Sequence, residues 1–335
     1  MAYTLAQLAK IETTPLKKGV ILNLLRYAPI MDSLPFENVD SLHSIAVRWK
    51  TLPGAAFRKV NASYTTSEGD VDQVEEAVYG MGGGIKFDRV FDKIKNVIQD
   101  PKVMQMDMKT RAMALTFNWY FINGDHAVDP DGFEGLKKRV ANMPTRQTVY
   151  AAASNAAGLD PTASTANARA FLDKLEEAYY KCNNGNVQMI IGNEAFRWSL
   201  GRAIRFLQAS GASFLSTQKD QFEREIMTYK GTPIYDAGLK VDQSTEVITL
   251  TEAGGTGTAN TTSFYLVSTS TPTGDVQGAI SEGLTGIQLG PMEIYDVAST
   301  GEQTEKHIDW WVGLANFGAH SIVRVRNLLS PASWT

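Results

Sequence analysis

The residue types that carry chemistry are present, but their spacing does not form a catalytic or metal-binding pattern. No histidine has another histidine four residues away, as a helix-borne metal pair would require; the four are His43, His126, His307 and His320. The single cysteine, Cys182, has no partner at metal-ligand spacing, and one thiol cannot close an intramolecular disulfide. We interpret it as a small buried apolar side chain.

The best metal candidate is His126, which lies near Asp125, Asp129 and Asp131. This group lacks the alternating oxygen ligands and the terminal glutamate of a calcium loop, so we interpret it as a polar surface loop. No phosphate-binding or dinucleotide-binding glycine motif is complete. We therefore predict no catalytic residue, no cofactor and no metal. An enzyme with an unrecognised cleft between helical and β-rich parts stays open as an alternative of a different class.

Composition and charge limit the classes of protein further. Of 335 residues, 43% are apolar and 20% are charged, which is typical of an ordered chain. The net charge of −4 argues against a protein whose main work is gripping nucleic acid. No apolar run approaches the roughly 20 residues that span a membrane, and no secretory signal is present. We expect the chain to be cytosolic when made, with no membrane partner.

The strongest helix prediction covers residues 101–122. Asp100 is a good cap, and Pro101 suits the first helical position because it needs no N–H donor there. The residues of one stripe then recur every three or four positions; they are Val103, Met106, Thr110, Met113, Phe117 and Tyr120, and Met104, Met108, Leu115 and Phe121 widen the stripe. We interpret the methionine-rich stripe as core. The helix would be about 33 Å long.

Residues 1–42 are predicted to form an arm. Thr14 and Pro15 start a short helix whose apolar residues include Leu16, Val20 and Leu24. This apolar helix has no nearby partner in the sequence, so we expect it to bury its face on another surface.

Residues 43–86 are predicted to form a long extended loop. Residues 44–50 alternate as a strand does, and Glu68-Gly69-Asp70 is predicted to turn the chain. Gly82, Gly83 and Gly84 are predicted to form a flexible hinge. A two-armed hairpin of this length would reach about 60 Å at about 3.3 Å per residue.

Charges on this loop are segregated along the sequence. The bases come first, and they are Arg48, Lys50, Arg58 and Lys59; the acids follow, and they are Glu68, Asp70, Asp72, Glu75 and Glu76. On the residues alone, two solvated faces are the favoured interpretation. The other is a strip of inter-subunit contacts that docks on a neighbouring copy and sets its register.

The rest of the chain predicts a compact mixed part and a β-rich end. Residues 167–181 are predicted to be helical, residues 187–191 form a buried strand, and Asn193 caps a third helix. From residue 230 onward short strands dominate, including 232–235, 246–250, 307–314 and 321–326. The overall class is α+β.

This order of arm, extended loop, glycine segment, long helix, mixed part and closing strands resembles the Hong Kong 97-type major capsid proteins of tailed bacteriophages. Four passages support the resemblance across the chain: Asn123-Gly124-Asp125 followed by Asp131 to Leu136, Met189 to Phe196, Gly231 to Ile234, and the tail from Ile308-Asp309-Trp310-Trp311 through Val323-Arg324-Val325. No passage is specific by itself, but their order is.

The resemblance implies four regions. Residues 1–42 would be the arm, 43–86 the extended loop, 87–186 with 291–335 the peripheral domain, and 187–290 the axial domain. Residues 254–262 and 271–278 would be axial tips.

The implied function is self-assembly through pentamers and hexamers into an icosahedral virion shell enclosing double-stranded DNA without sequence specificity. The implied partners are a separate scaffolding protein, a portal and a cement protein. An encapsulin-like nanocompartment and a decoration protein are the alternatives.

Overall fold

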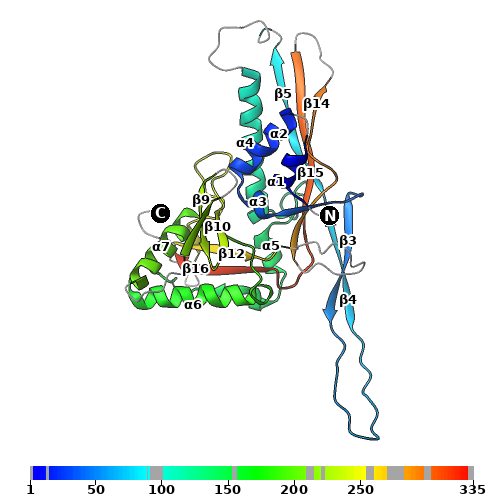
Figure 1. Cartoon of the computed structure of the whole chain (residues 1–335), viewed down its shortest axis with the longest axis vertical. Coiled ribbons are helices and arrows are strands. Elements are labelled where there is room, and N and C mark those ends of the chain that lie inside the picture. Colours follow the sequence, from blue (N-terminus) through cyan, green and yellow to red (C-terminus); the bar gives the residue numbers. More distant parts are fainter. Residues whose placement is uncertain are drawn as a thin grey trace.

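The computed structural model describes residues 3–12, 15–88, 90, 101–152, 157–208, 215–219, 223–253, 260–269, 283–297 and 303–330. It has two sheets, each covered by helices, and a two-stranded hairpin that projects far beyond the body (Figure 1). The segments 254–259 and 270–282, which contain most of the expected axial tips, lie outside the described residues. No helix among these residues has the length and apolar character to cross a membrane.

The first sheet is built around one long strand, β15 (Gln303–Asn316). It pairs with strands on both sides, and the members of the sheet are β1 (Tyr3–Thr4), β2 (Pro35–Asn38), β5 (Tyr79–Asp88), β13 (Leu284–Gln288) and β14 (Glu293–Val297). β5 runs antiparallel to β15 from Tyr79 to Asp88. Figure 1 shows β5, β14 and β15 extending together beside the long helix.

That long helix is α4 (Pro101–Asn123), which begins at the predicted proline. Its buried face packs aromatic rings against the sheet: the Phe117 ring lies 5.9 Å from the Trp310 ring, which lies 5.4 Å from the Phe36 ring. The predicted methionine core is only half right. Met106 and Met113 are buried, whereas Val103, Met104 and Met108 are 46–58% exposed. Met104 and Met108 are each two residues from Met106, which places them on the opposite side of the helix.

The N-terminal arm packs on its own chain. Its helices are α1 (Leu5–Ile11), α2 (Pro15–Tyr27) and α3 (Ile30–Ser33), and α2 lies against α4. Leu24 and Leu25 on α2 are fully buried. The expected helix start at Pro15 is confirmed, while Thr14 lies outside the described residues. The surface that this helix was expected to need is supplied by α4, which lies far along the same chain.

The second sheet joins strands from distant parts of the chain. Its members are β6 (Thr148–Tyr150), β7 (Met189–Gly192), β8 (Leu215–Lys219), β9 (Glu225–Tyr229), β10 (Thr232–Asp236), β11 (Glu252–Ala253), β12 (Asn260–Val267) and β16 (Ile322–Leu329). Two helices, α6 (Thr165–Lys181) and α7 (Glu194–Gln208), share one core with it. Stacked rings of Phe196 and Phe264, 4.2 Å apart, join α7 to β12. Asn193 caps α7 as predicted, because its Oδ1 accepts from the N–H of Phe196 at 2.9 Å.

Three short elements complete the described structure. They are α5 (Leu136–Ala141) and the 3₁₀ turns η2 (Thr145–Gln147) and η3 (Asn183–Gly185). After α4 the backbone crosses itself at two glycines, where the N–H of Gly135 donates to the carbonyl of Gly124 at 2.9 Å. A Cβ at Gly124 would lie 2.3 Å from the carbonyl of Phe133. Only glycine fits this crossing.

The packing groups the chain differently from the expected domain boundaries. Strand β16 and helix α6, both expected beside the long helix, pack in the second sheet's core, whereas β13 pairs in the first sheet. The strand expected at 246–250 is irregular, with Val247 and Ile248 buried between the two bodies. Strands β8 and β9 were not predicted. Pairing partners far away in the sequence decide these assignments, and no local period records them.

Candidate assembly surfaces

The projecting hairpin consists of β3 (His43–Thr51) and β4 (Asp70–Ala77), which pair antiparallel with Arg48 opposite Asp72. The basic strand β3 and the acidic strand β4 are therefore paired with each other within one chain. The side chains of Arg48 and Lys50 lie outside the described residues, although their backbone is in β3. Figure 1 shows that the hairpin extends away from both sheets.

The far half of the hairpin is a cationic and apolar tip, defined here as residues 52–67. The turn lies at Asn61, whose φ of 66° is left-handed, and not at Glu68-Gly69-Asp70 as predicted. Four large apolar side chains on it are 66–109% exposed; they are Leu52, Phe57, Val60 and Tyr64. An exposed apolar group of this kind marks an interaction site on a protein surface.

The predicted charges on the tip are Arg58 and Lys59, and no acid lies between residues 52 and 67. Arg58 stacks 5.0 Å from the ring of Tyr64, and its Nη1 donates to the carbonyl of Ala62 at 3.1 Å. The guanidinium thus helps to shape the turn. Glu68 is exposed beside the tip, and Asp70 begins β4, where its N–H donates to Thr51 Oγ1 at 3.2 Å.

The root of the hairpin is anchored by a buried ion pair. Arg139 on α5 donates Nη2–H to Glu76 Oε2 at 2.9 Å, and its Nη1 contacts the other carboxylate oxygen. The two side chains are only 7% and 14% exposed. Arg139 also donates to the carbonyls of Glu134 and Leu314. This network ties β4, α5 and β15 together at one point.

The inter-subunit role predicted for Glu76 therefore needs correction, because its carboxylate is already paired inside the chain. Its neighbour Glu75 differs: it is exposed and lies 3.1 Å from His43 across the hairpin. The alternation of a strand puts consecutive residues on opposite faces, so Glu76 points into the body and Glu75 to solvent. Sequence reasoning missed Arg139, since nothing in Lys137-Lys138-Arg139 marks which base is buried.

The hinge predicted at Gly82, Gly83 and Gly84 is not a turn. All three residues lie inside β5 and pair with Asp309, Ile308 and His307 of β15. A Cβ at Gly82 would lie 2.1 Å from the carbonyl of Ile308. Close approach of the two strands explains the glycine there, and any bending of β5 at this place stays a prediction.

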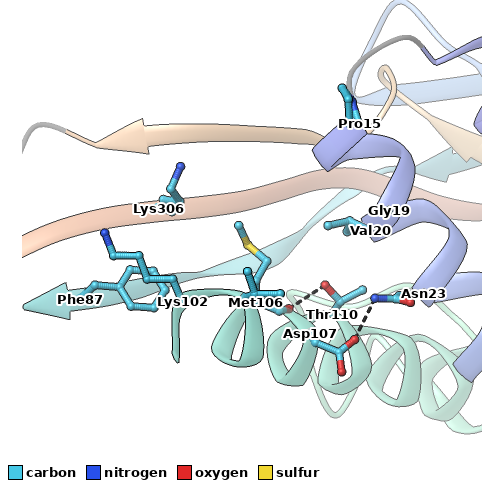
Figure 2. A pocket seen from close by; sticks show the side chains of 11 residues that line it. Pro15, Gly19, Val20, Asn23, Phe87, Lys102, Met106, Asp107, Thr110 and Lys306 are labelled. Atoms are coloured by element: carbon cyan, nitrogen blue, oxygen red, sulfur yellow. Dashed lines mark hydrogen bonds between the residues drawn. The ribbon is translucent and has the colours of Figure 1, made fainter. Parts of the chain in front are cut away.

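An apolar hollow of about 280 Å³ lies between α2, α4 and the ends of β5 and β15 (Figure 2). Val20, Phe87 and Met106 line it, and Asn23 Nδ2 donates to Asp107 Oδ1 at 2.8 Å along one wall. Its ionisable residues are Lys102, Asp107 and Lys306. This set does not place a nucleophile beside a base, so the hollow suits an apolar contact better than catalysis.

The loop of His126 carries polar contacts that stabilise its fold. Asp125 accepts from Lys138 Nζ at 3.1 Å, which holds the pKa of that carboxyl below its usual range. Tyr120 donates to Asp129, and burial together with this carboxylate raises the pKa of Tyr120 to about 12. Within the described ranges no three side chains of the metal-binding types converge on one point. The surface-loop interpretation fits these contacts.

Comparisons with solved structures identify the fold. The structure is similar to the SrpI encapsulin of Synechococcus elongatus PCC 7942, with a TM-score of 0.57 and 12% identity over 88% of this chain and 85% of that one. The capsid of a native GTA particle gives 0.57 and 13% over 91% and 90%, and the capsid of cyanophage A-1(L) gives 0.55 and 12% over 90% and 93%. The chain therefore has the Hong Kong 97-type capsid fold, and the predicted α+β class is confirmed.

A comparison of the sequence with protein families also gives a capsid protein. A profile of the family described as "Major capsid protein GP7" matches residues 17–160, which include the arm helix α2, the hairpin and α4. A comparison with curated protein sequences gives no match. The fold of the whole chain and this match to part of it both bear out the resemblance to tailed-phage major capsid proteins that was noted from the sequence.

Proposed function

We propose that the chain self-assembles through pentamers and hexamers into an icosahedral shell that encloses phage double-stranded DNA. The observation that carries this proposal is the hairpin, whose apolar tip projects beyond the body while its root is fixed by a buried ion pair. A rigid root with an uncovered tip is suited to reaching a neighbouring copy. In the shell the tip of one subunit lies on the next.

The energetics of this contact suit assembly. Covering one large apolar side chain contributes about 1.5–3 kcal/mol, so the tip residues give each neighbour contact a modest affinity. A subunit held by several such contacts is held strongly, since each later contact forms within an already tethered assembly. Weak single contacts also allow misplaced subunits to dissociate during growth.

The four regions keep their proposed roles with revised limits. Residues 1–42 form the arm and 43–77 the extended loop, since β5 belongs to the first sheet. The first sheet with α4 corresponds to the peripheral domain. The second sheet with α6 and α7 corresponds to the axial domain, and the segments around 254–262 and 271–278 are its tips. The exposed positions 103, 104 and 108 of α4 are a further contact surface.

Partners and location follow from the same role. We infer that a separate scaffolding protein, a portal and a cement protein accompany the shell, and that assembly takes place in the bacterial host cytoplasm. The DNA is enclosed without sequence preference, in agreement with the net charge of −4. The role is structural, without catalysis.

An encapsulin-like nanocompartment with a protein cargo is the second candidate, because the encapsulin and GTA structures give the same TM-score. The match of residues 17–160 to a major capsid protein family favours the DNA-filled shell. The contents of particles from cells expressing the natural gene set separate the two. Nuclease-protected genomic DNA supports the phage shell, and a single enriched protein cargo contradicts it.

Negative-stain electron microscopy of the purified chain tests assembly itself, over a range of concentration and salt and with a scaffold supplied. The expected result is closed shells, or pentamers and hexamers that convert to shells. A monomer or dimer under every condition contradicts the proposal and favours the alternative of an enzyme with an unrecognised cleft.

A further inference from the structure

One face of α7 carries an arginine that is held between two aromatic rings. Trp198, Arg202, Arg205 and Phe206 follow one another at helical spacing, so they share one side of the helix. The Arg202 guanidinium lies 5.3 Å from the Trp198 ring and 5.7 Å from the Phe206 ring. The four residues line a hollow of about 460 Å³ on the surface.

The two arginines on this face have no acidic partner among the described residues. Arg202 and Arg205 are both exposed, and neither forms an ion pair with any residue in the part of the chain that the structure describes. Arg205 donates Nε–H to the carbonyl of Gly201 on its own helix at 3.2 Å, a bond that does not use its terminal nitrogens. Other exposed or half-buried bases here, such as Arg197 and Lys230, do pair with acids.

Stacking between rings prepares Arg202 for a ligand. The rings fix the plane of the guanidinium, so less side-chain entropy is lost when its edge binds an anion. Arginine presents a fork of N–H donors that matches the oxygens of a phosphate group. Arg202 and Arg205 lie about 4.5 Å apart along the helix axis, so both side chains extend from the same side of the helix.

We propose that this face of α7, defined by Trp198, Arg202, Arg205 and Phe206, binds the phosphate backbone of duplex DNA without reading sequence. Duplex DNA offers one negative charge per roughly 1.7 Å of axis, so two cations close together find phosphates in any register. The contact would tether the enclosed DNA to the shell wall. It rests on the proposed function, because it identifies which surface of the shell protein touches that DNA.

The test measures binding of the unassembled full-length chain to a duplex of random sequence, by fluorescence anisotropy at several salt concentrations. The variant Arg202→Gln/Arg205→Gln removes the two cations. Loss of two phosphate contacts lowers the slope of log affinity against log salt by about 1.8, and it weakens binding at low salt on the order of tenfold.

The matched control is Arg146→Gln/Arg169→Gln, which makes the same change of net charge at two exposed arginines on η2 and α6. It is expected to bind as the unmodified chain does. Equal losses in both double variants would overturn the proposal, because net charge alone would explain them. So would an unmodified chain that binds polyglutamate as tightly as DNA, which would indicate an acidic protein partner.

Shell formation is scored separately by electron microscopy of the same samples. Shells that form while the unmodified chain fails to bind duplex overturn this inference and leave the proposed function standing. A chain that binds duplex through Arg202 and Arg205 but forms no shells contradicts the proposed function instead.

Discussion

Arg139 and Glu76 form a two-pronged ion pair at the root of the extended hairpin, and both side chains are almost fully buried. The pair joins Arg139 on α5, the helix that follows α4, to Glu76, the second-last residue of strand β4. It therefore sets the direction in which the hairpin leaves the body.

Removing one member of this pair is expected to destabilise the subunit strongly. Glu76→Ala leaves the Arg139 charge buried without its carboxylate, which costs about 3–5 kcal/mol. Urea unfolding of the isolated subunit measures this loss. The control is Glu75→Ala, which removes an exposed partner of His43 and costs less than about 1 kcal/mol. Equal losses for the two variants would show that the root pair is not the anchor.

Three glycines of β5 are expected to differ in their tolerance of alanine. A Cβ at Gly82 would meet the Ile308 carbonyl, so Gly82→Ala forces two strands apart and costs about 1–3 kcal/mol. A Cβ at Gly83 meets only the flexible end of Lys109, and one at Gly80 makes ordinary contact with Trp311 at 3.5 Å. Thermal unfolding of the three variants checks this order. A flexible hinge would instead tolerate all three.

Stability is expected to depend on pH through Glu246. Burial, followed by the charges of Asp236 and Glu194, raises the pKa of this carboxyl above its usual 4.5. The folded chain therefore holds the proton more tightly than the unfolded chain. The buried charge of Glu246 destabilises the folded chain. This cost is absent at pH values below the pKa that Glu246 has in the unfolded chain, and it is fully present above the pKa that it has in the folded chain.

Glu246→Gln removes that charge, and one of the carboxylate oxygens, Oε2, is buried without a hydrogen-bond partner among the described residues. The variant is expected to unfold at a higher temperature than the unmodified chain at pH 7.5, with the difference shrinking toward zero near pH 3.5. A difference that is independent of pH would contradict the assignment.

The sequence predicts best where local rules and tertiary packing agree. Pro101 starts α4, Asn193 caps α7, and the strand alternation before residue 50 marks β3. Each of these signals lies within one element. The order of the elements was enough to indicate the fold, because arm, hairpin and long helix follow one another along the chain.

Elsewhere, distant partners decide the outcome. Gly82 to Gly84 have a loop-like composition, yet the closeness of β15 makes them strand residues. Glu76 looks like Glu75 in sequence, and its partner is 63 residues away. Arg202 carried a usable signal that was overlooked, since Trp198 and Phe206 lie four residues before and after it on one helix face.

The most direct test of the account concerns the hairpin tip as a contact between subunits. Phe57→Ser/Val60→Ser removes two of its most exposed apolar side chains without touching the body, and Val128→Ser/Val241→Ser removes exposed valines elsewhere as the control. Thermal unfolding verifies that both variants keep the fold of the subunit. Electron microscopy and sedimentation then measure the fraction of subunits in shells. We predict that the tip variant stays as unassembled subunits while the control forms shells; shells from the tip variant at the unmodified yield would contradict the account.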